Sequence, residues 1–289
     1  MQESWTIGKL IAWTTGYFRD KGLEEARLEA EVLLARALER DRVYLYTHYD
    51  EPVNREERER MRGFVQRRVS GEPAAYICGQ HEFMSLSFTV NPDVLIPRPD
   101  TEILVETVCS LARELSAPSI CEVGTGSGAI AVSLAHYLPR ARIVATDISS
   151  AALEIARVNA QQNGAEVLFL AGDLLTPAAD QGPFDFIVAN LPYIPESQWE
   201  GLPLSVSRHE PRLALLAPGD GLDVYRRLLP QAVEMLLPNG YLCFEIGWDQ
   251  GKVARQMVRE NGGFYPTVEL RQDLAGRDRV VIAQKEGGA

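Results

Sequence analysis

The sequence predicts an α/β fold, in which a small helical bundle precedes a larger domain built on an open sheet. From about residue 119 onward, apolar runs of strand length alternate with helical segments. A glycine-rich turn joins the first of these runs to a helix, and residues 1–70 carry apolar side chains at helical spacing. With 289 residues and 46% hydrophobic content, the chain can bury a core in one large and one small domain.

Residues 1–70 are expected to form three short amphipathic helices. The last of them is expected to begin at Asn54, a suitable N-cap, and to end at Val69. Arginines and glutamates alternate along this helix. The pattern favours a solvated face with ion pairs one turn apart, and a docking surface for a partner is the alternative.

A short hairpin is expected over residues 82–90, where apolar and polar side chains alternate. It leads into Ile96–Pro99, whose two prolines stiffen the junction with the larger domain. Arg98 in this junction is expected either to lie over a cofactor or to bridge the domains.

Four apolar runs of the larger domain are expected to form strands of one sheet. They begin at Ser119, Arg142, Val167 and Phe184, and each leads into glycine or polar residues. In an open α/β sheet, ligands bind beyond the carboxyl ends of the strands. The residues that follow these runs are therefore the candidate ligand-binding groups.

The first candidate is the glycine turn 122–128, which precedes a helical run over 129–135. Glycines let the backbone approach a ligand closely, and the N–H groups at a helix start suit an anionic or carboxylate group. We therefore expect a nucleotide-like cofactor here. The relaxed dinucleotide fingerprint is also satisfied, so a nicotinamide enzyme is an alternative. The expected cofactor-binding residues of the turn are Gly124, Thr125, Gly126, Ser127 and Gly128.

Acidic residues follow the next two strands. Asp147 lies where the hydroxyl pair of a ribose needs an acceptor, and its alternative role is to cap the helix that starts near Ser149. Asp173 and the adjacent Leu174 follow the third strand, where an acceptor would suit an adenine amine. An ordinary turn residue is the alternative for Asp173.

The fourth strand ends in Asn190–Tyr193, the most informative segment of the chain. The side-chain carbonyl of Asn190 and the backbone carbonyl of Leu191 can together accept both hydrogens of a planar NH2 group. Pro192 follows them, and Tyr193 covers the flat face of the group. Such a nitrogen is a poor nucleophile and must be oriented, which indicates methyl transfer. A strand-ending turn is the plainer interpretation, because Asn and Pro are common in turns.

The rest of the chain is expected to complete the sheet. After Tyr193 comes a long loop, residues 194–218, which is expected to shape the substrate mouth. Beyond it we expect a helix over 223–237, a strand over 241–246 and a second helix over 251–261. A closing strand pair is expected near 267–270 and 279–284. His209 in the long loop is considered as a general base and not favoured.

These strand-end residues resemble the class I S-adenosylmethionine-dependent methyltransferases, and Asn190–Tyr193 resembles the Asn/Asp-Pro-Pro-Tyr signature of those that methylate planar nitrogens. Further segments resemble the bacterial peptide chain release factor N5-glutamine methyltransferases. In chain order these segments are residues 71–79, 95–102, 209–215, 244–247 and 273–279. The resemblance implies a Rossmann-like, seven-stranded methyltransferase sheet whose last strand is antiparallel.

The resemblance also implies the activity, which is methylation of the side-chain amide nitrogen (N5) of the glutamine in the Gly-Gly-Gln motif of release factors, with S-adenosyl-L-methionine as cofactor. The implied domains are residues 1–72 for substrate docking, a hairpin linker over 73–100 and the methyltransferase domain over 101–289. Leu191 departs from the family, which usually has Pro there. Leu keeps the backbone carbonyl but adds an N–H group that needs a partner if buried.

Charge helps to choose among substrates. Residues 1–70 hold 13 Lys+Arg and 13 Asp+Glu, whereas residues 71–289 hold 16 and 27, so the net charge of −11 lies in the second part. An acidic catalytic domain would repel a phosphate backbone. This disfavours adenine N6 methylation in nucleic acid. Two further hypotheses are glutamine methylation of a ribosomal protein and a cofactor-binding module without activity.

The remaining composition predicts a soluble, cytoplasmic protein. The four cysteines have no C-x-x-C spacing and are expected to be free thiols, and no metal is expected. The sequence opens without the basic-then-apolar pattern of a signal peptide, and no apolar run approaches the length of a membrane span. We expect release factors as protein partners, with no direct nucleic acid and no membrane.

Overall fold

The structure is a computed structural model that describes residues 5–287. Residues 1–4, which belong to the stretch where no signal peptide is expected, lie outside the described range. The chain divides into two compact units. The first extends to Gly79 and includes Pro203–His209, and the second contains Gln80–Leu202 and the chain from Glu210 onward.

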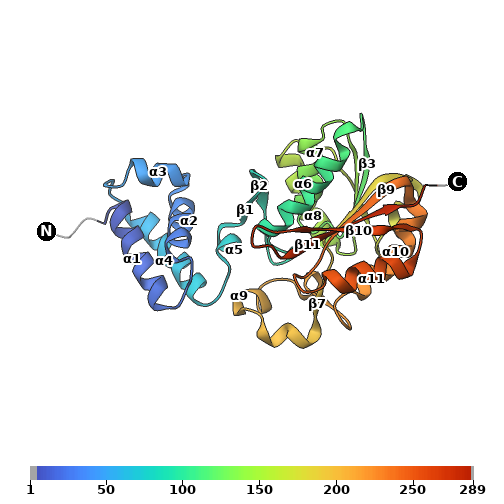
Figure 1. The fold of residues 1–289 in the computed structure, drawn as a ribbon. Helices are drawn as coiled ribbons and strands as arrows, with labels where there is room; N and C mark the ends of the chain where they lie inside the picture. Colours follow the sequence, from blue (N-terminus) through green and yellow to red (C-terminus); the bar gives the residue numbers. More distant parts are fainter. Residues whose placement is uncertain (1–4, 288–289) are drawn as a thin grey trace. The chain divides into compact units, whose positions relative to one another are not determined.

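The first unit is helical (Figure 1). Its helices are α1 (Ile7–Asp20), α2 (Ala26–Leu38), α3 (Arg42–Thr47), α4 (Arg55–Val69), α5 (Ala74–Cys78) and α9 (Leu204–Ser207). The three expected helices correspond to α1, α2 and α4, while α3 and α5 are too short for an apolar period to show in the sequence. The core of this unit includes Phe18, Leu33 and Leu45, each fully buried.

The cap predicted at Asn54 is confirmed. Its side chain accepts a hydrogen bond from the Glu57 backbone N–H at 3.0 Å, and the Glu57 side chain accepts one from the Asn54 N–H at 2.9 Å. This reciprocal pair is a capping box, which satisfies N–H groups that have no partner inside the helix.

The second unit is a seven-stranded sheet between two layers of helices (Figure 1). Its strand order is β10-β11-β9-β6-β3-β4-β5, and β11 runs antiparallel to its neighbours β9 and β10. The strands are β3 (Ser119–Val123), β4 (Arg142–Asp147), β5 (Leu168–Ala171), β6 (Phe184–Ala189), β9 (Leu236–Glu245), β10 (Phe264–Gln272) and β11 (Asp278–Lys285). The predicted seven-stranded α/β sheet with an antiparallel last strand is therefore confirmed.

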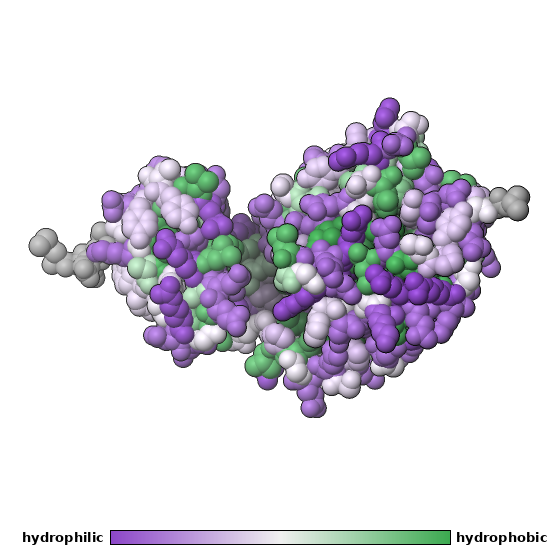
Figure 2. Space-filling view, viewed as in Figure 1, coloured by the Kyte–Doolittle hydropathy of each residue, from purple (hydrophilic) through white to green (hydrophobic). Residues whose placement is uncertain are grey.

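Helices α6 (Glu102–Leu111), α7 (Ala129–Tyr137) and α8 (Ser150–Gln162) cover one face of the sheet, while α10 (Asp223–Met235) and α11 (Gly251–Asn261) cover the other. The central strands are buried on both faces, as their continuous apolar runs require. Hydrophilic side chains dominate the face of the molecule shown in Figure 2, where apolar ones form small separate groups.

The smaller elements of the second unit lie in its connections. The hairpin expected over residues 82–90 consists of β1 (Gln80–Phe83) and β2 (Leu86–Thr89). The long loop contains the short parallel pair β7 (Ile194–Pro195) and β8 (Leu216–Ala217). Short 3-10 helices occur at Pro99–Thr101, Ala112–Glu114, Thr176–Gln181, Glu196–Gly201 and Arg212–Ala214.

The expected boundary between a helix and the next strand near residue 236 differs from the structure. Helix α10 ends at Met235, two residues earlier than expected, because Pro238 disfavours helical backbone at the residue before it. Strand β9 already begins at Leu236 and passes Asn239, whose φ is 62°, before its pairing with β6 becomes regular. A strand-length pattern could not show this irregular start.

The register of the parallel strands aligns their carboxyl ends. Val123 of β3 pairs with Thr146 of β4 and with Ala189 of β6, and Ala189 in turn pairs with Phe244 of β9. The next residue of each strand therefore belongs to one row along this edge of the sheet. That row is Gly124, Asp147, Asn190 and Glu245.

Replacing Asn54 with Ala should weaken α4 locally, because the Glu57 N–H loses its acceptor. We expect the opening free energy of α4 to fall by about 1 kcal/mol, measured by hydrogen exchange of α4 peptides with mass detection. Asn54→Ser, which restores an acceptor, should recover most of the protection. Equal exchange in the wild type and Asn54→Ala would contradict the capping role.

Candidate active site

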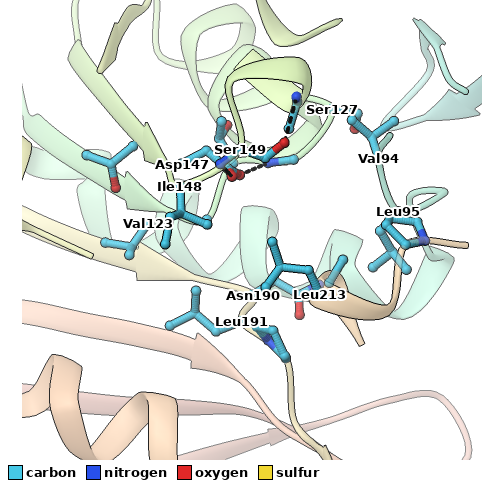
Figure 3. A pocket seen from close by; sticks show the side chains of 18 of the residues that line it. Val94, Leu95, Val123, Ser127, Asp147, Ile148, Ser149, Asn190, Leu191 and Leu213 are labelled. Carbon is cyan, nitrogen blue, oxygen red and sulfur yellow. Dashed lines mark hydrogen bonds between the residues drawn. The ribbon is translucent and has the colours of Figure 1, made fainter. Parts of the chain in front are cut away.

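A cleft of about 500 Å³ lies at the carboxyl edge of the sheet, within the second unit. Its size is typical of small-molecule sites. The expected site residues that line it are Gly124, Thr125, Gly126, Ser127, Asp147, Asp173, Leu174, Asn190, Leu191 and Pro192. Gly128 and Tyr193 are not among its lining residues. In Figure 3, Asp147 and Asn190 lie on opposite sides of the cleft, and β3 lies between their strands.

The glycine turn is braced against β4. The backbone N–H groups of Gly124 and Thr125 both donate to the Thr146 carbonyl, and the Gly126 N–H donates to Asp147 Oδ2 at 2.8 Å. These amides are therefore already used. Three other backbone amides line the cleft at the end of the turn and the start of the helix. They belong to Ser127, Ala129 and Ile130, and they have no acceptor among the described residues.

Asp147 serves as a brace as well as a candidate ligand. Its Oδ1 accepts from the Ser149 N–H at 2.8 Å, drawn in Figure 3, while the side chain of Ser149 itself caps α8. The helix-capping role that was the alternative for Asp147 therefore belongs to Ser149. Burial raises the pKa of Asp147, although backbone hydrogen bonds from Ser149 and Gly126 oppose the rise. Each carboxylate oxygen has a further lone pair for a ligand hydroxyl.

A buried carboxyl group inside β3, Glu122, holds the glycine turn from behind. It is 1% exposed, and its Oε2 accepts from the Thr125 hydroxyl at 2.6 Å and from the Ala131 N–H at 3.0 Å. Thr125 therefore points its hydroxyl inward. Burial raises the pKa of Glu122 to about 8, although these two hydrogen bonds oppose the rise. The sequence signal for this role is an acidic residue inside an otherwise apolar strand.

Asp173 forms an ion pair with Arg227 of α10, and both residues line the cleft. Any ligand group that uses the Asp173 carboxylate must share it with this guanidinium. Leu174 has a left-handed backbone, with φ of 49°, and its carbonyl accepts from the Thr146 hydroxyl at 2.8 Å.

Arg98 also lines the cleft and pairs with Glu210 at 2.5 Å. Glu210 is buried, and its second oxygen accepts from the Ile96 N–H at 3.2 Å. The long loop and the Ile96–Pro99 segment are thereby tied together within the second unit. His209, in contrast, belongs to the first unit and is not among the lining residues.

Asn190 presents a polar side chain to the cleft. Its Nδ2 donates to the Thr101 hydroxyl oxygen at 3.1 Å, and no donor among the described residues engages its Oδ1. The Leu191 carbonyl likewise accepts no hydrogen bond within the described range. Two acceptors on adjacent residues, Asn190 and Leu191, are thus available at the cleft.

The additional N–H group of Leu191 has a partner. It donates to the Tyr225 hydroxyl oxygen at 3.0 Å, and that hydroxyl donates to the Glu245 carbonyl at 2.6 Å. The Leu191 side chain is buried against Gly124, where an added Cβ would lie 2.6 Å from Leu191 Cδ2. The departure from Pro is therefore accommodated by α10 and by a glycine with φ of 73°.

Tyr193 is half-buried, and its hydroxyl donates to Glu245 Oε1 at 3.1 Å. Glu245 is 1% exposed, and this burial raises the pKa of its carboxyl group. No sequence pattern assigned a role to Thr101, Tyr225 or Glu245, although Thr101 and Glu245 lie in segments that carry the family resemblance.

Comparisons with known proteins agree with this geometry. Residues 9–79 match the family described as PrmC N-terminal domain, and residues 120–209 match a methyltransferase domain family. The chain is 46% identical over 279 residues to the release factor glutamine methyltransferase of Geobacter sulfurreducens, which covers 96% of each chain. It is 48% identical over 266 residues to that of Moorella thermoacetica, covering 91% of this chain and 93% of the relative.

The chain belongs to the release factor glutamine methyltransferase family. The predicted family resemblance is therefore confirmed, and the protein is a methyltransferase. Its fold is similar to that of the Thermus thermophilus 16S rRNA N2 G1207 methyltransferase, solved with AdoMet and guanosine, with a TM-score of 0.53 at 17% identity over 72% of this chain and 50% of the other. At that identity the likeness concerns the fold alone.

The pKa of Glu122 predicts a pH-dependent contribution to stability. Because its pKa is raised from 4.5 to about 8, the folded protein holds a proton that the unfolded chain releases between these values. The contribution is full below pH 4.5 and is lost as pH rises toward 8, at about 1.4 kcal/mol per pKa unit.

Glu122→Gln keeps an acceptor oxygen but cannot titrate, so its free energy of unfolding should decline less than that of the wild type between pH 5 and 8. Urea unfolding of both proteins at these two pH values measures the difference. Parallel pH dependence in the two proteins would show that Glu122 titrates normally in the folded state.

A second prediction concerns Leu191 and Tyr225. Tyr225→Phe leaves the buried Leu191 N–H without an acceptor, and proline at position 191 has no N–H to satisfy. Tyr225→Phe should therefore cost about 1–2 kcal/mol more stability in the wild type than in the Leu191→Pro background. Urea unfolding of the four proteins gives the coupling energy, and additive effects would argue against the hydrogen bond.

Proposed function

We propose that this enzyme transfers a methyl group from S-adenosyl-L-methionine to the side-chain amide nitrogen, N5, of the glutamine in the Gly-Gly-Gln motif of bacterial peptide chain release factors. The observation that carries the proposal is the pair of unengaged acceptors, Asn190 Oδ1 and the Leu191 carbonyl, at the end of β6. The names of the relatives, release factor glutamine methyltransferase, support the same substrate.

Two acceptors on one side suit a primary amide. A glutamine side chain has two N–H hydrogens and a nitrogen lone pair that is delocalised into its carbonyl. Acceptors that hold both hydrogens fix the plane of the NH2 group and favour the positive charge that grows on the nitrogen as it reacts. Asn190 and Leu191 thus supply positioning and electrostatic stabilisation, and no general base is required at His209.

The donor set of the cleft fits S-adenosylmethionine. The free amides of Ser127, Ala129 and Ile130 suit its carboxylate, and the Asp147 carboxylate suits the ribose hydroxyls. Asp173 and Leu174 line the region assigned to the adenine. When bound, the cofactor supplies an electrophilic methyl group on a sulfonium.

Tyr193 is assigned to cover the flat face of the substrate amide. Its hydroxyl is held by Glu245, which restricts the ring to one orientation. Pro192 limits the backbone of Leu191 and so holds the Leu191 carbonyl in place. Together with Asn190 and Leu191, these residues form the proposed catalytic segment.

The helical unit is proposed to dock the release factor. Three exposed arginines of α4 are paired with glutamates, which supports the solvated-face interpretation for those positions: Arg55, Arg60 and Arg67. Arg68 also pairs with a glutamate, Glu29, but its side chain is only 11% exposed. A groove between α1 and α4 is different, since it is lined by aromatic side chains and further arginines. They are Trp5, Trp13, Tyr17, Arg58 and Arg62. Aromatic and arginine side chains are enriched at protein interfaces.

Ribosomal proteins and nucleic acid are less well supported as substrates. The names of the two relatives described above mention neither a ribosomal protein nor adenine. The acidic second part of the chain also disfavours direct nucleic-acid binding.

We place the enzyme in the cytoplasm with its proposed substrate, and its cysteines are free thiols. None of the helices in the described range is long and apolar enough to span a membrane. No metal-binding group of His, Cys, Asp or Glu occurs among the same residues.

The proposal predicts transfer of labelled methyl from S-adenosylmethionine to a purified release factor, and none to its Gly-Gly-Gln variant with Gln→Ala. Asn190→Ala should lower kcat by roughly 100-fold or more, because the nitrogen loses one of its two acceptors. The matched control is Asn261→Ala, at the exposed end of α11, which should keep wild-type activity.

Labelling of ribosomal protein or adenine-containing DNA in place of the release factor would overturn the substrate assignment. Wild-type turnover by Asn190→Ala at saturating cofactor would instead overturn the role of Asn190.

A further inference from the structure

The cleft is lined by the sheet edge and by two segments that contain no strand of the seven-stranded sheet. These segments are residues 92–98 and residues 211–218, and we call the second of them the outer segment. In Figure 3, Val94 and Leu95 of the first segment lie across the cleft from Val123. The residues of the outer segment that line the cleft are all apolar: Pro211, Leu213, Ala214, Leu216 and Pro218. An apolar wall excludes water from a bound ligand, which strengthens the polar contacts elsewhere in the site.

The far end of the outer segment is held by a short parallel strand pair. Leu216 of β8 pairs with Ile194 of β7, and the Ile194 N–H group donates to the Leu215 carbonyl at 3.0 Å. Strand β7 begins directly after Tyr193. This end of the outer segment is therefore fixed to the proposed catalytic segment.

The near end is held by the side chain of Glu210. His209 still belongs to the first unit, so Glu210 is the residue at which the long loop returns to the second unit. Its Oε1 accepts from Arg98 Nη2 at 2.5 Å, and its Oε2 accepts from the Ile96 N–H at 3.2 Å. The receiving segment is itself fixed, because the side chains of Val94 and Ile96 are buried. Glu210 thus ties the start of the outer segment to the other segment that lines the cleft.

Burial makes this contact specific. The Glu210 side chain is 2% exposed. A buried carboxylate is costly unless charge pairing and hydrogen bonds compensate for the lost water. Here both oxygens are engaged, one by a guanidinium and one by a backbone amide. Compensation is complete only while Glu210 stays beside Arg98 and Ile96, and the outer segment begins at the next residue.

We propose that Glu210 is a positioning residue for the cofactor, because it holds residues 211–218 as a wall of the cleft through Arg98 and the Ile96 N–H group. The inference rests on the proposed function, since it takes S-adenosylmethionine as the ligand of the cleft. Arg98 acts within this contact and does not itself touch the cofactor.

The expected consequence is weaker cofactor binding with nearly normal chemistry. Without Glu210, the outer segment would spend part of its time away from the cleft, and the apparent Kd of a ligand rises by the inverse of the binding-competent fraction. Asn190 and Leu191 are held by other contacts, with Thr101 and Tyr225. At saturating cofactor, kcat should therefore change little.

The first test compares two substitutions of Glu210 by calorimetry with S-adenosylmethionine. Glu210→Leu removes both contacts and should raise the cofactor Kd roughly tenfold or more, the factor that corresponds to one charge-assisted hydrogen bond. Glu210→Gln keeps one acceptor oxygen and should raise Kd less. In both variants, KM for the cofactor should rise with Kd, and kcat on the release factor should stay within a few fold of the wild type. The matched control is Glu269→Gln, which removes an exposed ion pair with Arg271 on β10 and should leave Kd unchanged.

A double-variant cycle tests the role of Arg98. Its guanidinium lines the cleft, so direct contact with the cofactor is the rival interpretation. Arg98→Met alone should raise Kd, because Glu210 loses its charged partner. In the Glu210→Leu background, Arg98→Met should raise Kd no further, because the contact is already lost. A further rise would assign Arg98 to the cofactor and overturn the proposed path.

Hydrogen exchange with mass detection tests the wall without any ligand. The Ala214 and Leu215 amides donate to the carbonyls of Pro211 and Arg212, at 2.9 and 3.2 Å. In cofactor-free Glu210→Leu, peptides that cover 211–218 should exchange several-fold faster than in the wild type, while peptides of β3 and β6 should be unchanged. Unchanged exchange over 211–218 would overturn the inference, and so would an equal increase in β3, which would indicate a general loss of stability.

Wild-type Kd in Glu210→Leu would also overturn the inference, as would a loss confined to kcat. If Glu210→Leu does not fold, Glu210→Gln and Arg98→Met decide the question, since wild-type Kd in both would reject the role of Glu210. Failure of the proposed function gives a different result. A wild type that binds S-adenosylmethionine without labelling the release factor rejects the substrate alone, and a wild type that does not bind S-adenosylmethionine rejects the proposed cofactor.

Discussion

The site depends on the register of the parallel strands. Val123 of β3 pairs with Thr146 of β4 and with Ala189 of β6, and Ala189 pairs with Phe244 of β9. The four strands therefore end at the same level. A shift of one residue in any strand would turn its side chains to the opposite face. The alignment therefore places a glycine, two polar groups and a buried carboxyl in a single row at the edge of the sheet.

Buried carboxyl groups support this row from behind. Glu122 holds the glycine turn through Thr125 and the start of α7, and Glu245 holds the segment after β6. One oxygen of each carboxyl group accepts from protein donors, Oε2 of Glu122 and Oε1 of Glu245. These contacts hold the glycine turn and Tyr193 in place without a ligand, as a preorganised site requires.

The sequence predicted the strands and the residues at their ends because both depend on local pattern. Apolar runs buried on two faces indicate parallel strands, and parallel strands bring their carboxyl ends together. The roles of Glu122 and Glu245 could not be predicted in the same way. Their partners include Ala131 for Glu122 and Tyr193 for Glu245, and Tyr193 is 52 positions away from Glu245 in the sequence. Such pairs are determined by tertiary packing, and an acidic residue in an apolar run was the available signal.

Leu191 shows how a signature can extend beyond its own segment. In a linear comparison, Leu191 is a single departure from the family pattern. In three dimensions, the N–H group that it introduces is absorbed by a tyrosine on α10, and its side chain fits where Gly124 leaves space. Positions 191, 225 and 124 thus form one set of mutual contacts. If the segment Asn190–Tyr193 were moved into a relative without the tyrosine on α10, the sequence of the segment would be kept. The Leu191 N–H group would then lack its hydrogen-bond acceptor.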